Sequence, residues 1–365
     1  MPWFFYLNPL LTAGVAFLVY KTARRTRAVV FGALFFLVNV IFLLQVLAAG
    51  SAFLADRYTY IAYAGLIFIA VWAMEQLVRQ KRERKQWVAF ATVAVIAVFM
   101  VVTYNRCEVW KNGETLWTDV IEKYPGQNVA SYSNRGIAYT NTGQWDNALA
   151  DFTKAIAINP KYPVSYANRG VVYGNLGQTE NAIADFTKAL EIDTTYKLVL
   201  HNRGVAYGET GQYDKAVSDL LKAIRLDPKY ISAINNLSII YCQVNKLDSA
   251  IKICRDGLKA NPESAQLHAA LGNCFLEKGE TGDAVVQYRK CLETSDRNID
   301  ALLGMAVASY LKHDLPYAKG YINQARSVEP ALNDGMEGIE KLEKAGHPIS
   351  EGKKEIISRI FSLMK

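Results

Sequence analysis

The sequence lacks the motifs on which most enzyme families depend. It contains no GxxxxGK, GxGxxG, GxSxG or HExxH pattern, so it does not indicate a phosphate-binding loop, a nucleophile elbow or a zinc-protease helix. Its four histidines are scattered along the chain, and its five cysteines form no CxxC pair and share no ligand spacing with the histidines. We therefore expect no metal, no cofactor and no histidine-based catalytic site.

The cysteines are few and occur singly. They are Cys107, Cys242, Cys254, Cys274 and Cys291. Small buried thiols are the expected role for cysteines without a ligand pattern. An extracytoplasmic location would also permit a disulfide, and Cys274 with Cys291, on adjacent predicted helices, is then the favoured pair.

Charge is absent from long stretches at the N-terminus. Hydrocarbon about 30 Å thick is crossed by roughly 20 mostly apolar helical residues. Four such stretches occur, at residues 3–20, 28–54, 58–77 and 87–104. No positive charge precedes the first stretch and no small-residue cleavage site follows it, so it is not a secretory signal peptide. The sequence thus predicts a four-helix transmembrane region over residues 1–104.

Basic residues between these stretches predict an orientation. They cluster at residues 21–27 and 79–85, and short loops rich in Lys and Arg stay on the cytoplasmic side. With four spans, the N-terminus and everything after Tyr104 lie outside the cytoplasm. If the source is bacterial, the membrane that the spans cross is the cytoplasmic membrane. Nucleic-acid binding is the alternative for such basic clusters, but their position between apolar spans argues against it.

The rest of the chain repeats with a period of 34 residues. Alanine recurs at Ala148, Ala182, Ala216, Ala250, Ala284 and Ala318. An aromatic series with the same period comprises Tyr139, Tyr173, Tyr207, Tyr241 and Phe275. Prolines close units at Pro160, Pro228, Pro262 and Pro330.

This pattern resembles the tetratricopeptide repeat (TPR), whose unit is a hairpin of two helices. The resemblance predicts an all-α fold with six repeats over residues 129–332. Glycines at Gly143, Gly177, Gly211 and Gly279 are expected to form the turns, because glycine accepts a positive φ. Residues 105–128 are predicted to be a linker and capping helix, and residues 333–365 to be C-terminal capping helices. Stacked units coil into a right-handed superhelix with a concave face that suits a protein or peptide partner.

An asparagine ladder is predicted along that concave face. Its members are Asn134, Asn168, Asn202 and Asn236, and the series continues as Ala270 and Gly304. Amide side chains in register could hold an extended peptide by its backbone. This resembles the ladder of the O-linked N-acetylglucosamine transferases. The alternative is that each Asn caps or bridges neighbouring helices.

The residue after each Asn predicts a structural ion pair. The pairs are Arg135 with Asp151, Arg169 with Asp185, and Arg203 with Asp219. In the fourth unit both partners are lost together, to Leu237 and Ile253. Joint loss indicates that the two positions contact each other, so these arginines are not expected to bind a ligand.

Two segments outside the repeats carry a second resemblance. Residues 55–61 read ADRYTYI, and residues 106–117 read RCEVWKNGETLW. Their order resembles the C-terminal half of C-type membrane glycosyltransferases of the O-mannosyltransferase-like group, which carry extracytoplasmic TPRs. The resemblance implies a polyprenyl-phosphate sugar donor, with Arg57 beside Asp56 near the donor phosphate. The alternative is an Asp56–Arg57 salt bridge or a helix cap.

The family's catalytic acid lies in an outer loop that has no counterpart in this sequence. We therefore expect the chain to be either part of a longer enzyme or a remnant of one, and inactive in sugar transfer alone. The first hypothesis is a membrane-anchored TPR protein that binds a protein or peptide outside the cytoplasm. The alternatives are a functional portion of a protein O-glycosyltransferase, and a scaffold of an envelope or secretion complex.

Overall fold

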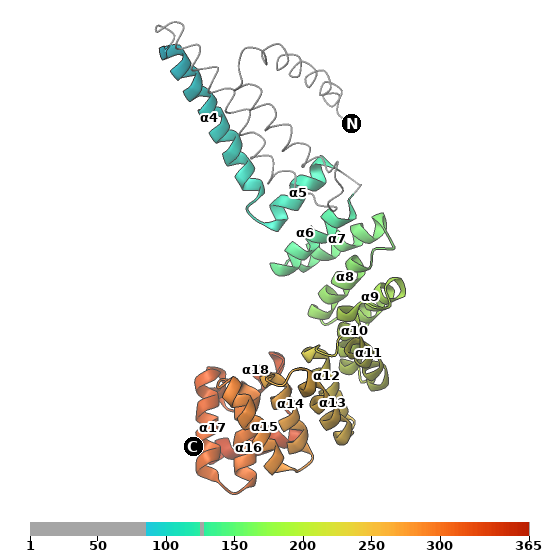
Figure 1. Cartoon of the computed structure of the whole chain (residues 1–365), viewed down its shortest axis with the longest axis vertical. Coiled ribbons are helices and arrows are strands. Elements are labelled where there is room, and N and C mark those ends of the chain that lie inside the picture. The colour runs from blue at the N-terminus through green and yellow to red at the C-terminus, as the bar shows by residue number, and fades with distance from the viewer. Residues whose placement is uncertain (1–84, 125–127, 365) are drawn as a thin grey trace, which may run out of the picture. The chain divides into compact units, whose positions relative to one another are not determined.

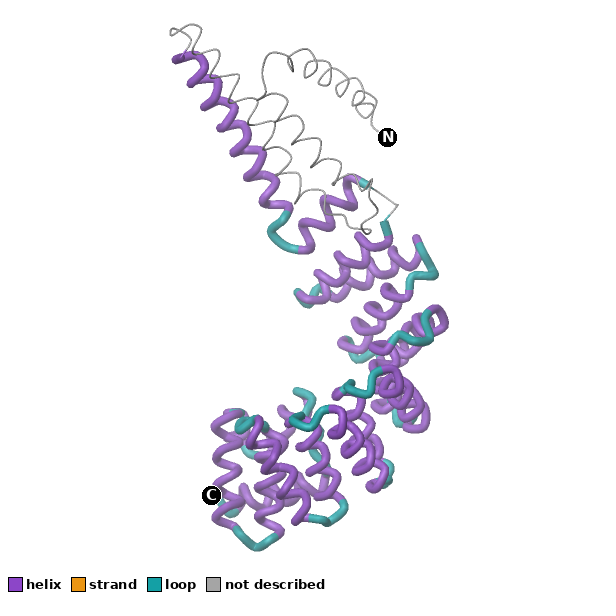
Figure 2. Tube along the Cα trace, in the orientation of Figure 1, coloured by secondary structure: helices purple, strands orange, loops and turns teal. Residues whose placement is uncertain are grey.

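The structure is a computed structural model that describes residues 85–124 and 128–364. These residues form helices and loops and contain no strand (Figure 2). The chain divides into two compact units, Met1–Glu108 and Val109–Lys365.

The described helix of the first unit is α4 (Lys85–Val109), which includes the fourth predicted span, residues 87–104. Among the residues that the structure describes, no helix combines the length and apolarity needed to cross a membrane. The fourth predicted span is therefore not supported. The other three predicted spans lie outside the described residues.

The second unit contains six consecutive helical hairpins, whose helices are labelled in Figure 1. Their first helices have 13 residues each: α6 (Val129–Asn141), α8 (Pro163–Asn175), α10 (Lys197–Glu209), α12 (Ile231–Gln243), α14 (Ala265–Glu277) and α16 (Ile299–Leu311). Their second helices have 14 residues each: α7 (Trp145–Ile158), α9 (Thr179–Ile192), α11 (Tyr213–Leu226), α13 (Leu247–Ala260), α15 (Thr281–Thr294) and α17 (Leu315–Val328).

The turns within the hairpins use left-handed backbone. Four have glycine there, with φ of 72° at Gly143, 70° at Gly177, 73° at Gly211 and 83° at Gly279, which confirms the prediction. In the fourth and sixth hairpins the same conformation falls on Asn245 (φ 56°) and His313 (φ 61°). Asn and His enter this region more readily than most other non-glycine residues, so the turn geometry persists without glycine.

Small residues let the two helices of a hairpin approach closely. The six alanines of the predicted series are buried, each at most 1% exposed. On the facing helix, a Cβ added at Gly136 would lie 2.8 Å from the Phe152 ring, and one added at Gly170 would lie 2.7 Å from the Phe186 ring. In these two hairpins the core therefore depends on a glycine, an alanine and a large side chain in fixed register.

The hairpins stack so that the first helices lie on the inner side of the curve. Each first helix contacts the first helix of the next hairpin, whereas the second helices of successive hairpins make no contact with each other in this unit. A stack that is closer along one row of helices curves toward that row. The first helices therefore line a concave face.

Short helices close both ends of the stack. Helix α5 (Gly113–Lys123) packs on α6. At the other end follow η3 (Pro330–Asp334), α18 (Met336–Lys344) and α19 (Glu351–Ser362), with Ile339, Ile357 and Ile360 fully buried. The apolar faces of the terminal hairpins are thus covered.

Candidate functional site

The four asparagines of the predicted ladder lie on α6, α8, α10 and α12, one on each first helix, and all four are partly exposed. The side chains of Asn134 and Asn168 make no hydrogen bond with any described residue. An amide offers two N–H donors and a carbonyl acceptor, which is the complement of a peptide group. These two side chains are therefore available to a ligand.

The other two asparagines are joined by a histidine that the sequence analysis did not single out. His201 Nδ1 lies 3.1 Å from Asn202 Oδ1, and Asn236 Nδ2 lies 2.9 Å from His201 Nε2. Burial lowers the pKa of His201, so the ring is neutral near pH 7. The neutral tautomer that carries its proton on Nδ1 satisfies both bonds. The ladder therefore has two unpaired members followed by two that bond His201, Asn202 within α10 and Asn236 across from α12.

A pocket of about 460 Å³ adjoins Asn134, between α5 and α6. Trp117 and Ile137 supply apolar surface, and Glu114 supplies a carboxylate whose described hydrogen bond, from Gln144 Nε2, is 3.3 Å long. An aromatic ring and a few polar groups in one concavity are typical of a site that accepts a side chain. This end of the concave face can therefore hold more than a peptide backbone.

The predicted Arg–Asp pairs lie between the two helices of a hairpin. Arg169 Nε and one terminal nitrogen lie 2.7 and 2.8 Å from the two oxygens of Asp185, and the same bidentate geometry joins Arg135 to Asp151 and Arg203 to Asp219. The hydrogen-bonded carboxylate raises the pKa of Arg169. These guanidinium groups are satisfied, so they act in folding.

Each of these arginines also reaches the preceding second helix. Its remaining terminal nitrogen donates to a threonine there, Thr153 for Arg169 and Thr187 for Arg203. For Arg135 the acceptor is Thr118 on α5, at 3.2 Å. Helix α5 therefore occupies the place of a second helix in a preceding hairpin.

The motif at residues 106–117 has a structural explanation in part. Asn112 Oδ1 accepts a hydrogen bond from the Thr115 backbone N–H at 2.9 Å, and Thr115 Oγ1 accepts one from the Asn112 backbone N–H at 3.3 Å. This reciprocal capping box begins α5. Asp56 and Arg57, the other residues of the glycosyltransferase resemblance, lie outside the described residues.

The concave face beyond α12 is covered by the chain's own C-terminal helix. On α19, Lys353 Nζ donates to Asn273 Oδ1 at 2.6 Å, and Ser350, at the start of the helix, donates to Glu277 at 2.5 Å. Burial lowers the pKa of Lys353. The asparagine series ends here as well, at Ala270 and Gly304, both buried. The open part of the concave face therefore runs from α6 to α12.

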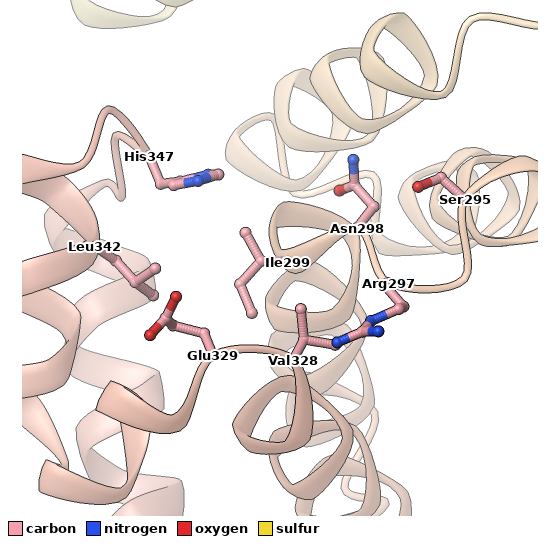
Figure 3. Close-up of a pocket in the computed structure, with 8 residues that line it drawn as sticks. All are labelled: Ser295, Arg297, Asn298, Ile299, Val328, Glu329, Leu342 and His347. Carbon is pink, nitrogen blue, oxygen red and sulfur yellow. The ribbon is translucent and has the colours of Figure 1, made fainter.

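A pocket of about 350 Å³ lies where this C-terminal segment meets the sixth hairpin (Figure 3). His347 faces it, and His347 Nδ1 lies 3.1 Å from Asp300 Oδ1. The hydrogen bond to Asp300 raises the pKa of His347. A protonated histidine paired in the folded state stabilises it below the unfolded pKa, about 6.5, and this contribution is lost as pH rises through the higher folded pKa.

We expect this pair to make the stability of the C-terminal segment depend on pH. Because both side chains are about one-third exposed (36% and 34%), the contribution should be about 0.5–1 kcal/mol below pH 6. In thermal unfolding, the free energy of unfolding of wild type should exceed that of the His347→Gln variant by this amount at pH 5.5. The two free energies should be equal well above the folded pKa. An equal difference at both pH values would contradict the assignment. Asp300→Asn should reproduce the loss.

The five cysteines are free thiols. The predicted pair, Cys274 with Cys291, is not joined. Cys274 instead lies close to Cys242, with a Sγ–Sγ distance of 3.6 Å. Within residues 85–124 and 128–364, no group of three or more His, Cys, Asp or Glu side chains is placed to hold a metal ion.

The second unit is thus an α-solenoid of helical hairpins with a partly open concave face. Tetratricopeptide repeat family matches cover residues 129–162, 163–196, 198–230 and 235–292, so this region consists of TPR repeats. The sixth hairpin, α16 and α17, follows the matched region. These matches concern the repeats and lend no support to the resemblance to membrane glycosyltransferases.

Solved structures share this fold at low sequence identity. A tetratricopeptide repeat protein from Parabacteroides merdae is 16% identical with a TM-score of 0.51, covering 79% of this chain and 98% of its own. The Cut9–Hcn1 hetero-tetramer of the APC/C is 16% identical with a TM-score of 0.50, covering 63% of this chain and 45% of its own. No curated protein matches the chain. These similarities establish the fold alone.

Proposed function

We propose that the open part of the concave face, from α6 to α12, binds an extended segment of a partner protein mainly through the partner's backbone. The observation that carries the proposal is that Asn134 and Asn168 are partly exposed and unpaired on equivalent positions of neighbouring first helices. Amides so placed can donate to a peptide carbonyl and accept from a peptide N–H. The pocket at Trp117 and Glu114 then accepts one side chain of the bound segment.

Loss of the two unpaired amides should weaken binding strongly. Peptides selected on the full-length chain from a random display library would serve as probes. For the Asn134→Ala/Asn168→Ala double variant, we expect the dissociation constant to rise about 10- to 100-fold, since each lost hydrogen bond contributes about 1 kcal/mol or somewhat more. Fluorescence anisotropy with a labelled peptide would measure it.

The chain offers a matched control on the opposite helices. Asn147 and Asn181 are exposed on α7 and α9, one repeat apart, and bond only to Gln144 and Gln178 in the described structure. The Asn147→Ala/Asn181→Ala variant should bind like wild type. N-methylation of the peptide backbone should weaken binding more than alanine substitution of most peptide side chains. Equal affinity of the two double variants would contradict the proposal.

We further propose that the chain is attached to a membrane by its N-terminal apolar stretches, with the repeats outside the cytoplasm. Support comes from the mostly apolar stretches at 3–20, 28–54 and 58–77 and from the basic loops that follow the first and third of them. The side on which the repeats lie depends on whether residues 87–104 complete an even number of spans. Protease accessibility of the repeats in intact cells tests this. The sugar-transfer and envelope-scaffold alternatives depend on the same topology.

A further inference from the structure

Two thiols meet at the boundary between the open and the covered part of the concave face. Cys242 lies near the end of α12 and Cys274 lies on α14, and these two first helices pack against each other. Their Sγ atoms are 3.6 Å apart, which is van der Waals contact. A disulfide requires an approach to about 2.05 Å, a shift that side-chain torsions can supply when the helices are already adjacent.

The two thiols differ in access to solvent. Cys242 is partly exposed, whereas Cys274 is 1% exposed. The hydrogen bond between the two thiols lowers the pKa of Cys242 and raises the pKa of Cys274. The more accessible sulfur is therefore also the one more readily present as a thiolate, the reactive form.

The neighbourhood favours this pair over the other cysteines. Around Cys242, burial and the Glu277 carboxylate raise its pKa, and the positive charge of Lys353 on α19, which is bonded to Asn273 next to Cys274, lowers it. Cys254 on α13 is a second neighbour of Cys274 but is fully buried, as is Cys291 on α15. Of the four cysteines in the repeats, a reagent in solvent therefore reaches Cys242 first.

We propose that Cys242 and Cys274 are a redox-active dithiol that closes into a disulfide between α12 and α14 by exchange with a small-molecule disulfide. The Cys242 thiolate attacks one sulfur of the reagent, forms a mixed disulfide and releases one thiolate. Cys274 then attacks Cys242 Sγ and displaces the second thiolate. The two cysteine protons pass to the two released thiolates. The protein dithiol loses two electrons, and the reagent disulfide gains them.

The cross-link would tie the last open first helix, α12, to the first covered one, α14. It closes a loop between residues 242 and 274 and so restricts any change of curvature at this boundary. This inference is independent of the proposed peptide binding, because it requires only the contact between the two thiols.

The test uses the full-length chain with Cys107→Ser, because Cys107 is exposed and would otherwise react. The protein is incubated with oxidised glutathione, blocked with N-ethylmaleimide and digested with trypsin. The four remaining cysteines fall on separate tryptic peptides: residues 230–246, 253–255, 260–278 and 291–297. Mass spectrometry therefore identifies the partner of each cysteine directly.

We expect two thiols to be lost and the peptide 230–246 to be linked to 260–278, with reversal by dithiothreitol. The cross-link should raise the melting temperature by about 5 °C, from the usual effect of closing a loop of this size. Cys291→Ser should behave identically, and Cys242→Ser should show neither the link nor the shift. Four unreacted thiols, a stable glutathione adduct on Cys242, or a link from 253–255 to 260–278 would each overturn the proposal.

Discussion

Replacing Gly304 by alanine is expected to destabilise the last two hairpins by about 3 kcal/mol, because the site has no room for a methyl group. An added Cβ would lie 2.3 Å from Cζ of Tyr288. The ring cannot retreat, because it is fully buried, packs against Gly272 on its own hairpin, and donates from its hydroxyl to Asn273 at 2.7 Å. The methyl group must therefore displace a helix.

The sixth hairpin also contains a control substitution of the same kind. Gly320 lies inside α17, is exposed, and would place an added Cβ more than 4 Å from other groups. Gly320→Ala should stabilise the helix by up to about 1 kcal/mol. Because repeat stacks unfold in parts, hydrogen exchange of α14–α19 in the two variants is the appropriate measurement. If both substitutions changed the stability of these helices in the same direction, the packing described for Tyr288 would be wrong.

The second large effect is expected at the Arg169–Asp185 pair. Arg169→Leu should cost about 3–5 kcal/mol, because it leaves the Asp185 carboxylate, only 8% exposed, without its bidentate partner. The double variant Arg169→Leu/Asp185→Ile should recover most of that loss. The fourth hairpin already has this solution, with Leu237 fully buried and Ile253 packed beside it.

A double-mutant cycle measures the coupling of this pair by denaturant unfolding. The surface pair Lys188–Glu191 on the same hairpin is the control, since its side chains are 59% and 56% exposed. Alanine at either of these positions should change stability by less than about 0.5 kcal/mol. If the double variant at the buried pair were no more stable than Arg169→Leu, the repacking inferred from the fourth hairpin would be wrong.

Much of the repeat fold was predictable because its contacts recur. The buried alanines, the glycine turns and the Arg–Asp pairs each appear several times at one spacing, so their register is visible in the sequence. The turns at Asn245 and His313 were not predicted, since each breaks the glycine pattern once.

The predicted ladder shows where this reasoning stops. Periodicity placed Asn134, Asn168, Asn202 and Asn236 on equivalent positions, and the structure brings them to successive first helices. Periodicity could not separate the two unpaired asparagines from the two that bond His201, because that histidine occurs in one repeat only. The adjacency of His201 to Asn202 in the sequence was the available signal.

The sequence by itself determined the hairpins and the pairs within them, because each such contact joins residues at a fixed short separation that selection has repeated. Tertiary structure decided which part of the concave face is open. The bonds from Ser350 to Glu277 and from Lys353 to Asn273 join residues 73 and 80 positions apart. Each of these bonds occurs once and joins a repeat helix to the C-terminal helix, so it leaves no period in the sequence. Each forms only when the stacked repeats present a surface for the C-terminal helix to cover.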